Sequence, residues 1–133
     1  MTAVLTAIVP EKGVRQVYNG TGGTLSKGTF VKLKASATYK GEIEAAAGNT
    51  DNVYGVLVND IADASRGDCQ IAGRAIVLAG GTIAEGEQVM PTTGAKALKA
   101  TSGNSIVGTA VTVGAASAYM EVELGAGCGA AMP

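Results

Sequence analysis

The sequence predicts an all-β protein, a compact barrel or sandwich of short strands built from two similar halves. No stretch shows the sustained 3.6-residue apolar period that an amphipathic helix requires. Instead, short apolar runs alternate with turn residues at even spacing, which is typical of all-β domains. The phrase GGTLSKG at residues 22–28 returns as GGTIAEG at residues 80–86, which indicates that one β unit occurs twice.

Length and composition favour a single domain. A chain of 133 residues fits the usual size of about 100–200 residues per domain. Tryptophan is absent and aromatic residues make up 4 % of the chain, so the core must consist of Val, Ile, Leu and Ala. We divide the chain into an N-terminal arm at residues 1–13, a β-barrel domain at residues 14–124 and a flexible Gly/Ala tail at residues 125–133.

The first strands follow from runs of β-branched and alternating residues. Val14 to Tyr18 forms a short run, and a turn cluster rich in Asn and Gly follows it. We expect further strands at residues 29–34, 39–46, 53–58, 68–72 and 75–79. Residues 53–58 are almost all apolar, as expected for a strand buried on both faces. Residues 61–66 fit either a loop or one helical turn.

The second half repeats this order from Gly80 onward. Val89 follows the last glycine of its phrase by three positions, as Val31 does in the first copy. Because proline has no N–H to donate to a neighbouring strand, Pro91 should end its strand or place it at an edge. Residues 108–111 are the counterpart of residues 55–58, and the alternating residues 118–124 form the last strand.

The composition argues against several classes of function. Lys and Arg total 10 against 11 Asp and Glu, and they are scattered singly, whereas a nucleic-acid site needs clustered cations. No apolar run approaches the ~20 residues of a membrane span, and the N-terminus lacks the basic region of a secretory signal. We therefore expect neither nucleic acid nor membrane as a partner, and synthesis in a cytoplasm. In a reducing compartment Cys69 and Cys128 should be free thiols, the alternative being a disulfide that ties down the tail.

Catalytic and metal sites are also not expected, nor is any cofactor. The chain contains no histidine, which removes the commonest general base and metal ligand. Carboxylates recur in close pairs, and spacing of two on a strand indicates a solvated face. The pairs are Glu42/Glu44, Asp60/Asp63, Glu85/Glu87 and Glu121/Glu123. A Ca²⁺ site at Asp60, Asp63 and Asp68 would match no EF-hand spacing. Because histidine is absent and the carboxylates should face solvent, we expect a protein that is not an enzyme.

Three phrases, taken in order, resemble the small β-barrel head decoration (capsid cement) proteins of tailed bacteriophages. They are YGVLVND at residues 54–60, GDCQIAGRAIV at residues 67–77 and GGTIAEGEQV at residues 80–89. The resemblance spans roughly residues 15–125 and rests on their order and repetition. It implies a non-catalytic homotrimer on the outer surface of the virion head, with the major capsid protein shell as partner.

The N-terminal arm is the best candidate for contacting that shell or a sister subunit. Val4, Leu5, Ile8 and Val9 are apolar and precede the strong strands. Such an arm can order by strand addition to the edge of a partner's sheet; alternatively, it forms the first strand of the barrel. A second functional hypothesis is a carrier or binding module of the lipoyl or biotinyl type, in which Lys96 at a hairpin turn would be the modified residue.

Overall fold

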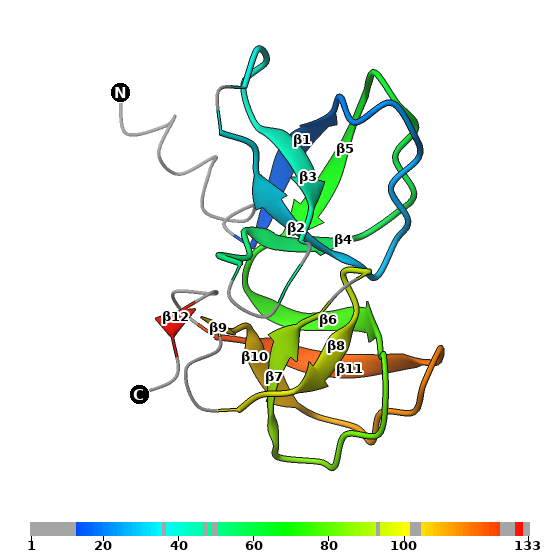
Figure 1. The fold of residues 1–133 in the computed structure, drawn as a ribbon, viewed down its shortest axis with the longest axis vertical. Coiled ribbons are helices and arrows are strands. Elements are labelled where there is room, and N and C mark those ends of the chain that lie inside the picture. Colours follow the sequence, from blue (N-terminus) through cyan, green and yellow to red (C-terminus); the bar gives the residue numbers. More distant parts are fainter. Residues whose placement is uncertain are drawn as a thin grey trace, which may run out of the picture.

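The computed structural model describes residues 13–35, 37–46, 48, 51–92, 94–101, 105–125 and 130–131. It confirms the predicted all-β class, because the regular elements within these ranges are strands. Figure 1 shows two groups of strands: β1 to β5 lie in one lobe, and β6, β7, β8, β10 and β11 lie in the other. A short pair, β9 (Ser105–Ile106) with β12 (Ala130–Ala131), lies beside the second lobe.

The first half is a closed barrel. Its strands are β1 (Val14–Asn19), β2 (Phe30–Leu33), β3 (Glu42–Ala45), β4 (Gly55–Leu57) and β5 (Ser65–Gln70). They follow the order β1-β3-β2-β4-β5, and β1 closes the ring by pairing with both β3 and β5. The β1–β3 contact is parallel, whereas the other pairs are antiparallel.

The second half repeats this arrangement strand for strand. Its strands are β6 (Gly73–Leu78), β7 (Gln88–Pro91), β8 (Ala97–Lys99), β10 (Gly108–Ala110) and β11 (Tyr119–Leu124). Their order is β6-β11-β10-β7-β8. A parallel bridge between Ala79 and Ala97 occupies the position in the second half that the parallel β1–β3 contact occupies in the first barrel. The halves that the sequence predicted are therefore two similar units in tandem.

The repeated phrase makes the same backbone contacts in both halves. Leu25 exchanges two backbone hydrogen bonds with Ile61, at 2.9 and 2.8 Å, and Ile83 exchanges two with Gly114. Gly28 then donates to the Leu57 carbonyl at 2.9 Å, as Gly86 donates to that of Ala110 at 2.8 Å. The phrase thus carries the chain across one end of each unit, and its aliphatic residue pairs with the loop that follows β4 or β10.

The last glycine of each phrase is required by its conformation. Gly28 has φ +79° and Gly86 has φ +84°, in the left-handed region that costs a residue with a Cβ about 1–2 kcal/mol. Gly28 is also tightly packed, because a Cβ there would lie 2.7 Å from Cε1 of Tyr119. Around Gly86 the same space is open.

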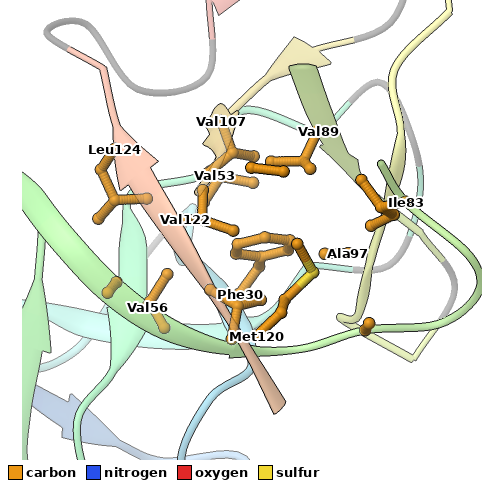
Figure 2. Close-up of a cluster of buried hydrophobic side chains, with 14 of the residues drawn as sticks. Phe30, Val53, Val56, Ile83, Val89, Ala97, Val107, Met120, Val122 and Leu124 are labelled. Carbon is orange, nitrogen blue, oxygen red and sulfur yellow. The ribbon is translucent and has the colours of Figure 1, made fainter. Parts of the chain in front are cut away.

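The larger core cluster joins the two halves. Phe30, Val53 and Val56 from the first half pack with residues of the second, among them Val77, Val89, Ile83, Met120 and Val122. Figure 2 shows the Phe30 ring between β-strand side chains of the second half. A second, smaller cluster lies within the first barrel and consists of Val17, Val31, Ile43, Leu57, Ile61 and Cys69.

Backbone hydrogen bonds also link the halves. The Leu78 N–H donates to the Gly28 carbonyl at 2.8 Å, and the Phe30 N–H donates to the Ala95 carbonyl at 2.9 Å. Gly28 therefore bonds to β4 through its N–H and to β6 through its carbonyl. The predicted duplication accounts for the units, and these contacts determine how the units meet.

Some expected boundaries differ. The turn between β5 and β6 lies at Ile71–Ala72, whereas the sequence placed it at Gly73–Arg74. Residues 61–66 form no helical turn: Ile61 makes its bridge to Leu25, and β5 begins at Ser65. The strand at residues 53–58 is shorter than expected, but its three residues are buried as predicted. Pro91 is the last residue of β7, as expected for a residue without an N–H.

Candidate interaction surface

The apolar residues of the predicted arm, Val4, Leu5, Ile8 and Val9, lie outside the described residues. The structure first describes the chain at Gly13, whose carbonyl accepts a hydrogen bond from the Ile71 N–H at 2.9 Å. Within the predicted tail, the described Ala130 and Ala131 pair with β9. A role of the arm in binding the shell or a sister subunit stays a prediction.

Lys96 lies in the turn between β7 and β8, where the sequence placed a hairpin. Its carbonyl accepts a hydrogen bond from the Thr92 N–H at 3.0 Å, and the residue is half-buried. A Cβ added at Gly80 would lie 3.3 Å from that of Lys96, so the base of this side chain packs against the neighbouring turn. A modified lysine of a carrier module needs a freely projecting side chain, which this environment does not favour.

Glu42 contradicts the expectation that the carboxylate pairs lie on solvated faces. It is 4 % exposed, and its carboxylate accepts hydrogen bonds from the N–H groups of Thr38 and Tyr39, at 3.0 and 3.2 Å. The ammonium group of Lys34 lies 3.2 Å away. The Tyr39 N–H foremost, together with Lys34 and Thr38, holds the pKa of Glu42 below its ordinary value, although burial opposes this shift. The sequence does not reveal this role because the partners lie in the preceding loop.

The other carboxylate pairs have mixed roles. Asp60 accepts the Lys27 N–H and Asp63 accepts the Gly22 N–H, each at 2.8 Å, so both fix the repeated phrase of the first half. Glu87 accepts the Ala84 N–H at 2.8 Å and pairs with Lys99 at 2.9 Å. The carboxylates of Glu121 and Glu123 form long, solvent-exposed ion pairs with the Arg74 guanidinium group, at 3.7 and 3.8 Å.

The described part of the chain holds no group of three side chains suited to a metal ion. Two of the three residues of the alternative Ca²⁺ site, Asp60 and Asp63, instead accept hydrogen bonds from backbone N–H groups. Cys69 is a buried thiol in the core of the first barrel, while Cys128 lies outside the described residues. The described ranges also contain no helix long and apolar enough to cross a membrane.

A groove lies between the two halves. It has a volume of about 300 Å³ and is bounded by β4 and the end of β5 on one side and by β6 and the start of β11 on the other. Its lining residues are Lys27, Gly28, Val56, Leu57, Val58, Gln70, Arg74, Ile76 and Tyr119. The groove lies where the first copy of the repeated phrase meets the second unit.

Three large apolar side chains of this groove are half-exposed. Val58 is 49 %, Ile76 is 54 % and Tyr119 is 51 % exposed. Exposed apolar side chains that gather in one place mark contact sites for other molecules. None of these three residues was among those predicted to contact a partner. Their signal is weak: Ile76 and Tyr119 are apolar residues at exposed positions of strands in which Ala75, Val77, Met120 and Val122 are buried.

The charged residues in the lining are both cations. The Lys27 ammonium group lies 5.7 Å from the centroid of the Tyr119 ring, within the range of a cation–π contact. Arg74 faces Glu121 and Glu123 on the neighbouring strand, which offset its charge. Chemically, the groove offers an apolar floor with a cation at its rim, which suits binding.

Comparison with known proteins gives a likeness of fold. No family model matches the chain, and no curated protein sequence matches it. Among solved structures, it is similar to the crystal structure of the head fiber gp8.5 N base of bacteriophage phi29, with a TM-score of 0.68 and 15 % sequence identity. The match covers 90 % of this chain and 97 % of that chain, so the likeness includes both halves.

Proposed function

We propose that this chain is a non-catalytic structural protein of a bacteriophage head. The observation that carries the proposal is the shared fold with a phage head fiber base over nearly the whole of both chains. The order of phrases that resembles phage decoration proteins supports it independently, because it was read from the sequence. A chain without histidine, whose described carboxylates largely bind backbone N–H groups or cations, is also suited to holding a shape.

The finer proposal is a decoration or cement role. The chain is made in the host cytoplasm, attaches to the outer surface of the head shell and bridges neighbouring capsid subunits as a homotrimer. Three copies offer three equivalent sets of contacts, so that modest individual interfaces give tight overall attachment. The apolar arm at Val4, Leu5, Ile8 and Val9 would add contacts to the shell or to a sister subunit.

The test uses heads assembled without this protein. Purified full-length chain is added and the particles are sedimented; saturable binding in a fixed ratio to the capsid protein is expected. Heat-induced opening of the heads should shift to higher temperature when the chain is bound. Absence of co-sedimentation contradicts the proposal. Binding without any gain in head stability contradicts the cement role and leaves attachment, as in a fiber base.

Oligomeric state is measured separately, by light scattering of the purified chain and by counting copies on saturated heads. A mass of three chains supports the homotrimer. A monomer both in solution and on the head contradicts it.

A further inference from the structure

Among the described strands, β6 pairs with β11 alone, so its other edge, which faces the groove, has no partner strand there. The edge that pairs with β11 continues in register just past both strands, where the Ala79 N–H donates to the Ala118 carbonyl at 2.9 Å. Backbone groups of successive residues in a strand point to opposite sides, so those of Leu78 and Ile76 point away from β11. The Leu78 N–H confirms this direction, because it donates to Gly28 across the groove end.

The edge is open at Ile76. Two residues before it, the Arg74 carbonyl accepts a hydrogen bond from the Gln70 side chain at 2.8 Å; two residues after it, Leu78 is bonded to Gly28. Among the described residues, no hydrogen bond reaches the Ile76 N–H or carbonyl from this side. A donor and an acceptor therefore stand next to each other above the apolar floor, which is the pattern that an added strand satisfies.

The charges beside this edge select what can occupy it. Glu121 and Glu123 offset the charge of Arg74, whereas the Lys27 ammonium group lies over the Tyr119 ring. Among the described residues, no ion pair involves that ammonium group; Asp60 instead accepts a hydrogen bond from the Lys27 backbone N–H. The ammonium group thus has room for a carboxylate from a ligand.

We propose that the groove binds an extended peptide segment of a neighbouring head protein, which adds a short strand to β6 at Ile76. An aliphatic side chain of that segment packs on Val58, Ile76 and Tyr119, and an adjacent carboxylate lies beside Lys27. The inference rests on the proposed function, since it names the contact site and the chemistry of the partner. It favours a segment of another protein over β6 of a second copy, because β6 carries Arg74 in place of a carboxylate.

The test needs no heads. Isotope-labelled full-length chain is titrated with two capped peptides, Ac-Thr-Val-Glu-Val-Thr-NH2 and Ac-Thr-Val-Lys-Val-Thr-NH2, and followed by amide NMR. The first peptide should shift the Ile76 amide signal, slow its hydrogen exchange and bind about fivefold more tightly than the second, as expected for one partly exposed ion pair. An unmoved Ile76 signal at millimolar peptide overturns the site, and equal affinities overturn the carboxylate contact.

Two variants and a control sharpen this result. Lys27→Glu should reverse the preference between the peptides, and Ile76→Asp should abolish binding of both. Val113→Asp is the matched control, because Val113 is 61 % exposed and lies outside the groove; it should bind like the parent chain. Equal loss in the control contradicts a specific groove. If the heads bind the chain but the peptides do not, the groove proposal is wrong and the proposed function stands. If the peptides bind but the heads do not, the proposed function is wrong.

Discussion

At the scale of single residues, the buried side chain of Asn19 holds the turn that follows β1 in place. Its Nδ2 donates to the carbonyls of Gly23 and Ile61, at 2.8 and 2.7 Å, and its Oδ1 accepts from Thr21. The second half does without such a group. Ser117 donates to Ala79 there, as Ala64 donates to Asn19 in the first half, so alanine occupies the matching position. The polar turn of the first half therefore depends on this one residue.

Asn19→Ala should lower the free energy of unfolding by about 2–3 kcal/mol, because it removes the hydrogen bonds that this buried side chain makes to Gly23, Ile61 and Thr21, each worth about 0.5–1.5 kcal/mol. Urea unfolding followed by circular dichroism measures the change. Gln16→Ala, on the same strand but exposed, is the control and should change stability by less than about 0.5 kcal/mol. Equal effects of the two substitutions would show that the Asn19 bonds do not matter.

Glu42 should make part of the stability dependent on pH. Its pKa in the folded protein lies below the ordinary value because of the Tyr39 N–H, Lys34 and the Thr38 N–H. A carboxyl group whose pKa is lowered on folding stabilises the folded protein fully at pH values above its ordinary pKa. This contribution is lost as the pH falls through the lowered pKa. Glu42→Gln should therefore be less stable than the parent at neutral pH, and the difference should shrink on acidification.

The measurement is the free energy of unfolding in urea at a series of acidic pH values. Glu85→Gln serves as control because Glu85 is exposed, and its curve should run parallel to that of the parent. A difference between Glu42→Gln and the parent that stays constant down to acid would contradict the charge-based role of Glu42.

At the scale of elements, the two copies of the repeated phrase offer a matched comparison. Gly28→Ala and Gly86→Ala both force alanine into positive φ, which should cost about 1 kcal/mol in each case. Only at Gly28 does the new Cβ also meet Tyr119, so this variant should lose a further ~1–3 kcal/mol from overpacking. Thermal and urea unfolding of the two variants give the difference.

A second substitution isolates the cause. The double variant Gly28→Ala/Tyr119→Ala is compared with Tyr119→Ala alone. The loss of unfolding free energy caused by Gly28→Ala should then fall to the cost of positive φ, because the ring that would clash with the new Cβ is gone. If the extra cost persists, the limiting contact is with the backbone nitrogen of Leu78, which would lie 3.4 Å from the new Cβ.

Elements with a regular pattern were predictable from the sequence, and others were not. β4 is a continuous apolar run and β11 alternates, so both appear close to where the pattern puts them. β8 and β9 are too short to carry a periodic signal, and their pairing depends on distant strands. The glycine phrases predicted two similar units because they record local backbone requirements.

The site was less predictable than the fold. A groove depends on how two units pack, and Ile76, Val58 and Tyr119 come from segments that sequence spacing does not relate. Glu42 was misjudged for the same reason, because its burial follows from the loop at Thr38 and Tyr39 rather than from strand alternation. Local patterns describe elements, whereas contacts between elements decide which side chains remain accessible.

At the scale of the whole molecule, the shared core should make the halves unfold together. Val122→Ala in the second half should cost about 2 kcal/mol by leaving a cavity in the larger cluster. Hydrogen exchange of the Val17 amide, in the other barrel, should then become faster by the same free energy as that of Val77. If Val17 keeps the protection of the parent chain while Val77 loses it, the halves are independent folding units.

The connection between the halves has a mechanical consequence. Only Ile71 and Ala72 separate β5 from β6, and the Gln70 side chain spans them by donating to the carbonyls of Ala72 and Arg74. The hydrogen bond from Leu78 to Gly28 adds a second link between the two barrels. Together, these contacts restrict rotation of one barrel relative to the other. We therefore expect the molecule to act as a rigid rod, so that a pull on one end is transmitted to the other and the distance between two attachment points on it stays constant.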